Sequence, residues 1–262
     1  MIPTKAYATF DAHSPFKPHT VQRRDPGAYD VLIDIAFCGI CHSDLHTARG
    51  EWHGVKFPVV PGHEIVGRVS RVGGKVSKFK AGDTVGVGCF VGSCGECARC
   101  KEGLESYCEK GAVGTYNGVD SDGQPTYGGY SKQIVVPERF VLRVDAKQKL
   151  EAVAPLLCAG ITTWSPLKHW KVGKGHKVGV LGLGGLGHMA VKLASALGAE
   201  VTLISGSPSK KKDAERLGAS GFVPTAEIGK VGPRFDLIID TVSAKHDLGA
   251  VLSALKFEGT AV

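Results

Sequence analysis

The stretch Lys177-Val178-Gly179-Val180-Leu181-Gly182-Leu183-Gly184-Gly185-Leu186-Gly187 decides the fold of the second half of the chain. Its first five residues are an apolar run of strand length, and its last six satisfy the pattern G-x-G-x-x-G. That pattern alone is weakly specific. Here it follows a predicted strand and opens an amphipathic helix, which is the context of a dinucleotide-binding fingerprint. The glycines would let a pyrophosphate approach the helix N-terminus. The alternative is a tight packing turn that binds no ligand.

Strands and helices alternate on both sides of this loop, from about residue 150 to the end of the chain. Apolar residues recur with a period near 3.6 after the loop, and we expect them on the buried face of a helix: Leu186, Met189, Ala190, Leu193 and Leu197. Further strands are predicted over 201–204, 222–223 and 235–240, with the start of another over 259–262. Further helices are predicted over 150–157, 161–170, 210–217 and 247–255. This alternation predicts an α/β domain over 151–262, with a parallel sheet covered by helices.

The end of the second predicted strand bears on which dinucleotide is bound. An NAD site typically has an acidic residue there, which accepts hydrogen bonds from the ribose hydroxyls. This chain has Ser205-Gly206-Ser207-Pro208-Ser209 followed by Lys210-Lys211-Lys212. Glu200 opens the strand instead of closing it, roughly 16 Å from the far end at ~3.3 Å per residue. Hydroxyls and lysines suit a 2′-phosphate, so NADP is favoured. The alternative is that the lysines form a solvated helix face.

Residues 1–150 are predicted to be β-rich. Short alternating or β-branched runs occur at 30–37, 64–72, 83–87 and 133–144, separated by Gly, Pro and Asp. Gly73-Gly74 and Ala81-Gly82-Asp83 are turn signals between such runs. We expect no long amphipathic helix in this half.

Composition places the chain among two-domain globular proteins. It has 262 residues, 43% hydrophobic and 22% charged, with 36 glycines. The net charge of +7 suits an anionic cofactor or simply a solvated basic surface. No apolar run approaches the ~18 residues of a membrane span, and the first residues lack the apolar core of a signal peptide. Eight cysteines without an export signal indicate a reducing, cytoplasmic location and metal ligation.

Four cysteines within 15 residues form a compact group in the segment 92–110. Cys94, Cys97, Cys100 and Cys108 have the spacing C-x2-C-x2-C-x7-C, and glycines between them give the backbone room to turn. Four thiolates at this spacing can close a tetrahedron around a structural zinc. The alternative, four unrelated free thiols, is disfavoured by the spacing. Cys38 and Cys89 fall outside the pattern and are interpreted as small packed residues; for Cys38 the alternative is a role as a metal ligand.

The segment Cys38-Gly39-Ile40-Cys41-His42-Ser43-Asp44-Leu45-His46 is dense in reactive side chains directly after a predicted strand. If Cys41 binds a metal, His63 in Gly62-His63-Glu64 and the otherwise unassigned Cys158 are candidate partners. Together they would make a Cys2His site with a fourth position open to water or substrate. From spacing alone this trio is a hypothesis, because the three residues are far apart in sequence.

Five motifs in order resemble the zinc-dependent medium-chain alcohol dehydrogenases. They are Gly39–Asp44, Gly62–Glu64, the four-cysteine group, Cys158–Thr163 and the glycine loop. The resemblance runs to Val262 and is strongest to the cinnamyl alcohol dehydrogenase group and its NADPH-dependent aldehyde reductases. It implies a GroES-like catalytic domain over 1–150, a Rossmann domain over 151–262, and hydride transfer between NADP(H) and an alcohol/aldehyde pair.

Residue roles follow from the same resemblance. It implies a catalytic zinc on Cys41, His63 and Cys158, with Glu64 beside the metal and Asp44 orienting His63. Ser43 and His46 match the family's proton relay. Residues implied to bind the cofactor are His42, Thr162, Gly182, Gly184, Gly185, Leu186, Gly187, Ser205, Ser207 and Lys210. Trp52 and Trp164 would line the substrate pocket, or else pack in a core.

Members of this family normally continue past the position of Val262, so we expect the chain to be C-terminally truncated and its Rossmann sheet incomplete. The family's usual pairing segment lies in the missing part; a homodimer remains compatible with the sequence, and no nucleic acid or membrane partner is expected. Two functions remain. One is an NADPH-dependent zinc aldehyde reductase. The other is a catalytically silent zinc-binding fragment or interaction module. A zinc-free quinone reductase is disfavoured by the complete ligand set.

Overall fold

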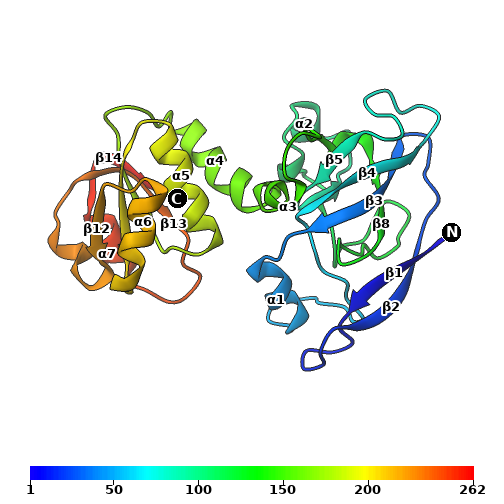
Figure 1. The fold of residues 1–262 in the computed structure, drawn as a ribbon, viewed down its shortest axis with the longest axis horizontal. Helices are drawn as coiled ribbons and strands as arrows, with labels where there is room; N and C mark the ends of the chain where they lie inside the picture. The colour runs from blue at the N-terminus through cyan, green and yellow to red at the C-terminus, as the bar shows by residue number, and fades with distance from the viewer. The chain divides into compact units, whose positions relative to one another are not determined.

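The computed structural model describes residues 1–262, which divide into two compact units, Met1–Cys158 and Ala159–Val262 (Figure 1). Each unit has its own hydrophobic core. No single helix is long and apolar enough to cross a membrane; only the pair 150–157 and 159–169, taken together, reaches that length and composition.

The first unit is built on a five-stranded antiparallel sheet of order β8-β3-β4-β5-β9. Two short antiparallel pairs, β1-β2 and β6-β7, complete its strands. The strands are β1 (Ile2–Ala8), β2 (Lys17–Arg23), β3 (Asp30–Cys38), β4 (Ile65–Val72), β5 (Thr84–Val87), β6 (Phe90–Gly92), β7 (Val113–Gly114), β8 (Gln133–Pro137) and β9 (Leu142–Arg143). Side chains that alternate to the inner face, such as Val31 and Ile33, form the core.

Short helical segments link these strands. They are α1 (His42–Ala48), α2 (Ala98–Lys101), α3 (Leu150–Val153), and the 3-10 turns η1 (Glu105–Tyr107), η2 (Glu138–Phe140) and η3 (Ala154–Leu157). The strand predicted over 133–144 is wrong in its middle, because after Pro137 the chain turns through η2 before β9. The helix predicted over 150–157 is α-helical only to Val153; Pro155, which has no backbone N–H to donate, lies in η3.

The second unit is a five-stranded parallel sheet of order β12-β11-β10-β13-β14. Its elements are α4 (Ala159–His169), β10 (Lys177–Leu181), α5 (Gly185–Ala196), β11 (Glu200–Ser205), η4 (Pro208–Lys210), α6 (Lys211–Leu217), β12 (Gly221–Pro224), η5 (Thr225–Lys230), β13 (Phe235–Asp240), α7 (Leu248–Ser253) and β14 (Leu255–Ala261). The order reverses between β10 and β13, as in a Rossmann sheet, where a dinucleotide binds at the carboxyl ends of the strands. The predicted α/β fold class is confirmed.

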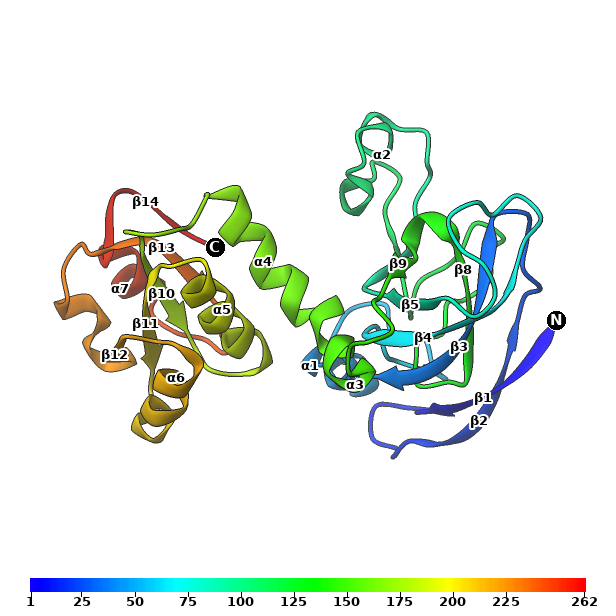
Figure 2. The ribbon, with the colours of Figure 1, turned by 45° about the horizontal axis from the view of Figure 1, so that its top comes forward.

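Helices cover both faces of this sheet (Figure 2). Val178 and Val180 face a core that includes buried residues of α4, α5 and α6, whereas Leu181 and Ile238 face the core under η5 and α7. The sheet therefore separates two apolar layers, as the alternation of strand and helix predicts.

Two predicted details of the second unit are wrong. The buried face of α5 consists of the small residues Gly187, Ala190, Val191 and Ala194, while Leu193 and Leu197 lie at its margin. Leucines are excluded from this face because α5 approaches the sheet closely. The strand predicted over 259–262 begins earlier, at Leu255, with a bulge where Glu258 adopts φ +62°.

Candidate metal centres and dinucleotide loop

The structure brings four predicted residues of the first unit together. Cys41 precedes α1, His63 and Glu64 precede β4, and Cys158 follows η3; one ligand atom from each lies within 4.8 Å of the others. The Sγ atoms of Cys41 and Cys158 are 3.9 Å apart, far beyond the ~2.05 Å of a disulfide. Residues distant in sequence thus form one compact donor set.

Asp44 fixes the orientation of His63. Its carboxylate is fully buried and accepts hydrogen bonds from His63 Nδ1 (3.2 Å), the Gly62 amide (3.0 Å) and the Cys41 amide (2.9 Å). Burial alone would raise the pKa of Asp44, but these hydrogen bonds outweigh it and the pKa is lowered. An ionised Asp44 requires the proton on Nδ1, which leaves Nε2 free to bind a metal.

Glu64 is the unsatisfied member of the group. It is only 3% exposed, and its Oε2 atom has no hydrogen-bond partner. Burial raises the pKa of Glu64 to about 7. The hydrogen bond with Cys158, followed by burial, raises the pKa of Cys41 to about 11. Such a cluster of buried carboxyl and thiol groups is costly unless a cation compensates it.

These residues fit a zinc ion. Two thiolates bound at ~2.3 Å in a tetrahedral site lie about 3.8 Å apart, close to the 3.9 Å between Cys41 and Cys158. Sulfur and imidazole donors are the ligands that zinc prefers, and a carboxylate oxygen of Glu64 belongs to the same donor set.

The four-cysteine group forms a second, separate donor set. The Sγ atoms of Cys94, Cys97, Cys100 and Cys108 all lie within 4.8 Å of one another. Cys94 and Cys100 are 3.9 Å apart, again the edge of a zinc–thiolate tetrahedron. Four sulfurs leave no open position, so this lobe suits a structural ion.

Backbone amides in this lobe donate hydrogen bonds to cysteine sulfurs, which stabilises the ionised thiolate form. The amide of Cys97 donates to Cys94 Sγ (3.4 Å) and the amide of Cys100 donates to Cys97 Sγ (3.5 Å). Amide hydrogen bonds from Glu96 and Cys97 lower the pKa of Cys94 to about 6. A metal that binds a thiol of low pKa has less competition from protons for the sulfur.

The predicted relay residues lie on α1, directly after Cys41. Ser43 and His46 are three positions apart on the helix and share a face. The His46 ring stacks on His42 (centroids 4.8 Å) and on Trp52 (5.6 Å), and its Nδ1 contacts the Glu51 carboxylate. Trp52 is 48% exposed and so is not a core residue.

The two remaining thiols stand outside both donor sets. Cys38 faces Gly62 and Gly129, where a Cβ atom would come within 2.8 Å and 2.7 Å of its sulfur. Burial raises the pKa of Cys38 to about 12. Cys89 is a neighbour of Cys158, whose thiol lowers the pKa of Cys89 by hydrogen bonding.

The glycine loop of the second unit connects β10 to α5. Gly182 has φ +90°, and a Cβ atom at Gly187 would lie 2.3 Å from the Gly182 carbonyl oxygen. These two glycines are therefore required by the turn and by the close packing of α5. A Cβ atom at Gly184 or Gly185 would meet open space, so no contact within the protein demands glycine there. An exposed helix N-terminus without side chains fits a pyrophosphate.

The end of β11 carries the predicted specificity residues. Ser205 is buried and accepts a hydrogen bond from the Ser207 amide (3.2 Å), whereas Ser207 itself is exposed. Lys210 follows within η4. Glu200 lies at the opposite end of the strand. Thr162 and Trp164 lie on α4, where both are exposed and Lys168 covers the Trp164 ring at 5.4 Å.

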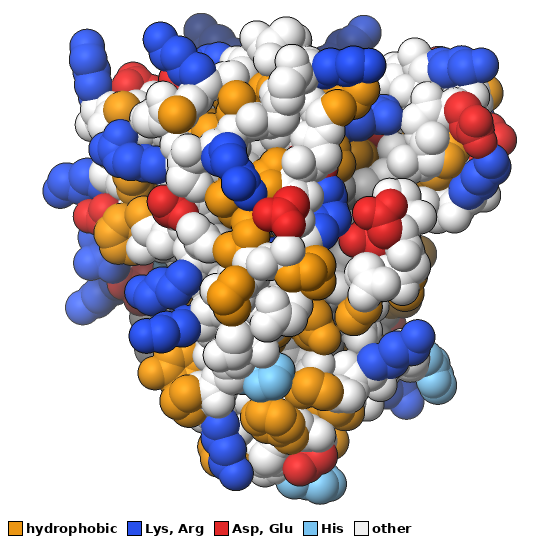
Figure 3. Space-filling model, turned by 90° about the vertical axis from the view of Figure 1, so that its right-hand side faces the viewer, with side chains coloured by type: hydrophobic (Ala, Val, Ile, Leu, Met, Phe, Trp, Pro, Cys, Tyr) orange, Lys and Arg blue, Asp and Glu red, His pale blue; other side chains and the backbone are white.

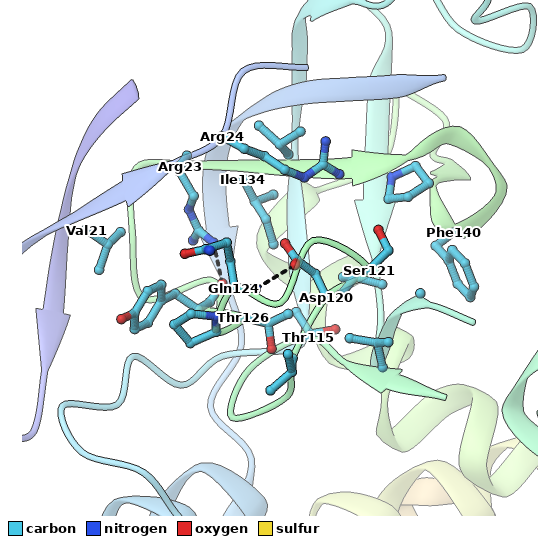
Figure 4. Close-up of a pocket in the computed structure, with 18 of the residues that line it drawn as sticks. Val21, Arg23, Arg24, Thr115, Asp120, Ser121, Gln124, Thr126, Ile134 and Phe140 are labelled. Atoms are coloured by element: carbon cyan, nitrogen blue, oxygen red, sulfur yellow. Dashed lines mark hydrogen bonds between the residues drawn. The ribbon is translucent and has the colours of Figure 1, made fainter. Parts of the chain in front are cut away.

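A separate cavity of about 830 Å³ in the first unit contains none of the Cys41 group. Figure 4 shows Arg23 and Arg24 beside the loop that carries Asp120 and Gln124. The buried Arg23 guanidinium donates to the carbonyls of Tyr127 (2.6 Å) and Gly128 (3.0 Å), which holds this loop to β2. On the face drawn in Figure 3, Lys and Arg side chains are interspersed with acidic and hydrophobic ones.

Sequence reasoning missed three residues around the Cys41 centre. Tyr130 donates its hydroxyl to Asp44, the Tyr116 ring lies 5.6 Å from that of His63, and Glu51 contacts His46. The tyrosines are more than 50 residues from their partners, so no local pattern identifies them. Glu51 follows His46 by five residues, a spacing with no recognised helical pairing.

Comparison with known proteins agrees with this architecture. Residues 27–146 match the family described as "Alcohol dehydrogenase GroES-like domain", and residues 185–262 match "Zinc-binding dehydrogenase". The chain therefore belongs to the zinc-binding, medium-chain alcohol dehydrogenase family, and the resemblance stated from its motifs is confirmed.

Within that family the chain falls in the cinnamyl alcohol dehydrogenase group. It is 56% identical to NADP-dependent alcohol dehydrogenase C 1 of Mycolicibacterium smegmatis over 266 residues, covering 100% of this chain and 76% of that protein. A cinnamyl alcohol dehydrogenase structure from Sorghum bicolor superposes with TM-score 0.96 at 47% identity, over 99% of this chain and 75% of that one. The crystal structure of CAD from Helicobacter pylori complexed with NADP(H) superposes with TM-score 0.95 at 49% identity, over 99% of this chain and 75% of that one.

Proposed function

We propose that this chain is a zinc-dependent oxidoreductase that transfers hydride between NADP(H) and an alcohol/aldehyde pair, acting on aromatic or aliphatic aldehydes. The observation that carries the proposal is the donor set of Cys41, His63, Glu64 and Cys158 within 4.8 Å. Relatives at 51–56% identity that are named alcohol dehydrogenases support the reaction class.

In this proposal Cys41, His63 and Cys158 hold the catalytic zinc, with Glu64 beside it and Asp44 orienting His63. Zinc bound there supplies a Lewis acid that polarises the substrate oxygen. Cys94, Cys97, Cys100 and Cys108 hold a structural zinc. The protein's own task at the first centre is to keep imidazole and thiols in one geometry, which the buried Asp44 carboxylate supports.

Proton delivery is assigned to α1. When the aldehyde accepts hydride at carbon, its oxygen needs a proton, and Ser43 is the hydroxyl nearest in sequence to Cys41. His46, on the same helix face, would resupply Ser43, since imidazole is the side chain most often used to transfer protons in catalysis. The contact of its Nδ1 with Glu51 and the stacking on His42 and Trp52 hold the His46 ring in place.

Cofactor binding is assigned to residues of the second unit, Thr162 among them, together with His42 of α1. The open N-terminus of α5 at Gly184, Gly185, Leu186 and Gly187 would receive the pyrophosphate after the turn at Gly182. Ser205, Ser207 and Lys210 would surround the adenosine 2′-phosphate, which favours NADP(H) over NAD(H). The M. smegmatis relative carries NADP dependence in its name, which supports the same choice.

We further propose that residues 1–150, with the zinc lobe 92–110, form the catalytic domain and residues 151–262 the cofactor domain. The small-molecule substrate is an alcohol or aldehyde. A cytoplasmic location and a homodimer stay predictions; the eight unpaired cysteines support a reducing compartment.

Zinc content and turnover of the purified chain test this proposal together. We expect two zinc ions per chain and oxidation of NADPH in the presence of an aromatic aldehyde such as benzaldehyde. Two zinc ions without turnover would instead support a catalytically silent zinc-binding module. One zinc ion per chain would contradict the assignment of the Cys41 centre.

A further inference from the structure

Tyr130 lies on a segment that runs beside the one carrying His63. The amides of Gly128, Gly129 and Tyr130 donate to the carbonyl oxygens of Val60 (2.7 Å), Gly62 (2.8 Å) and Pro61 (2.9 Å), respectively. The three acceptor residues, 60–62, immediately precede His63 in the chain. The position of the Tyr130 backbone is therefore tied to that of His63.

The Tyr130 side chain reaches the same centre from the other side. Its hydroxyl donates to Asp44 Oδ2 at 3.1 Å, the oxygen that also accepts from the Cys41 amide. Asp44 Oδ1 accepts from His63 Nδ1 and the Gly62 amide. Since Asp44 has no exposed surface, water cannot replace a lost donor without rearrangement.

Each oxygen of the Asp44 carboxylate accepts two of the four hydrogen bonds. Oδ2 is held by Tyr130 and Cys41, so the carboxylate plane is set, and Oδ1 is thereby directed at His63. The Tyr130 ring itself is packed edge-on against Phe16 at 5.8 Å. Removing the hydroxyl would leave the ring in place and free one side of the carboxylate to rotate.

We propose that Tyr130 is a positioning residue for the metal centre: through Asp44 it orients the His63 imidazole and so raises the affinity of the Cys41–His63–Cys158 site for zinc. This inference rests on the proposed function of that site. Groups that orient metal ligands directly, as Asp44 orients His63, typically change metal affinity by about 10–100-fold, and a contact one step further out, such as Tyr130, belongs at the lower end.

The test compares Tyr130→Phe with Tyr127→Phe. Tyr127 packs in the same small apolar cluster, and its hydroxyl makes no hydrogen bond within the protein, so it is a matched control. Zinc affinity is measured on each full-length variant by competition with a chromophoric chelator, which reports the two sites as separate phases. We expect about tenfold weaker zinc binding at one site in Tyr130→Phe, no change at the four-cysteine lobe, and no change in Tyr127→Phe.

A double-mutant cycle with Asp44→Asn shows whether Tyr130 acts through the carboxylate. If it does, Tyr130→Phe has no further effect on zinc affinity in the Asp44→Asn background. The visible absorption of the cobalt-substituted protein should also shift in Tyr130→Phe, because the imidazole is less well oriented; a purely structural loss of stability would leave this spectrum unchanged. Thermal unfolding of the same samples identifies such a loss.

Equal zinc affinities for Tyr130→Phe and the unchanged protein would overturn the role of Tyr130 while leaving the proposed zinc enzyme intact. Additive effects of Tyr130→Phe and Asp44→Asn would also overturn it. A single zinc per chain in the unchanged protein would overturn both this inference and the proposed function.

Discussion

Asp44 holds two of the predicted metal ligands, Cys41 and His63, in place through hydrogen bonds. It occupies the third position of α1, caps that helix through the Cys41 amide, and holds the ring of His63. One side chain thus sets the start of a helix, the position of a thiol and the tautomer of an imidazole. Leu45, the next residue, has no such task, so the reactive residues of this segment are the consecutive run 41–44 together with His46.

Ser43→Ala tests the proton relay. We expect turnover with an aldehyde to fall about 100-fold, in the range typical of lost general acid–base catalysis, with two zinc ions still bound. Steady-state kinetics and metal analysis measure the two effects, and Ser121→Ala on an exposed loop is the control. Unchanged turnover in Ser43→Ala would count against the relay, and lost zinc would show that the residue is structural.

Among the secondary-structure elements, α5 shows how a ligand loop and a packing contact share one motif. Its sheet-facing side carries only small residues, and Gly187 brings the helix to the Gly182 carbonyl. Its N-terminus, at Gly184 and Gly185, is bare toward solvent. The glycines of the motif therefore separate into those that the fold needs and those that a ligand would need.

Gly187→Ala and Gly185→Ala should separate these two requirements. The added methyl at residue 187 collides with backbone at 2.3 Å, so we expect a loss of about 2 kcal/mol in stability. The methyl at residue 185 meets open space, so stability should hold while NADPH binding weakens at least tenfold. Chemical denaturation and NADPH fluorescence titration measure the two quantities. Normal NADPH affinity in Gly185→Ala would argue against a pyrophosphate at this helix end.

Lys210→Ala tests the cofactor choice at the end of β11. Loss of its charge should raise the KM for NADPH about tenfold and leave the KM for NADH nearly unchanged, because only NADPH carries the 2′-phosphate. Lys212→Ala, on the exposed side of α6, is the matched control. Equal effects on both cofactors would contradict a phosphate contact and favour a general role for the lysines on the surface.

For the whole molecule, the sequence predicted those features that depend on local patterns. The strand at 177–181 and the strand at 235–240 were predicted with their observed bounds, since continuous apolar runs bounded by glycine or polar residues mark buried parallel strands. The grouping of Cys94 with its three neighbours also follows from spacing. The joining of Cys41, His63 and Cys158 does not follow from spacing, because the three residues are far apart in sequence; it stays a hypothesis there until the resemblance to a family supports it.

Features that depend on tertiary contacts could not be predicted from the sequence. The strand pair β1-β2 and the helix α1 were not predicted, because the first lacks a clean alternation and the second is a short helix capped by Asp44. The role of Tyr130 required the packing of 128–130 against 60–62. The buried face of α5 differs from its most hydrophobic face because close packing selects small residues over large ones.

Stepwise removal of zinc, with turnover followed on the same samples, tests the central claim most directly. Dipicolinate added to the purified chain should remove the zinc at the Cys41 centre before that of the closed four-cysteine lobe. We expect aldehyde-dependent NADPH oxidation to fall in proportion to the first zinc lost per chain, and to return when zinc is restored. Turnover that persists after both zinc ions are gone would contradict the account.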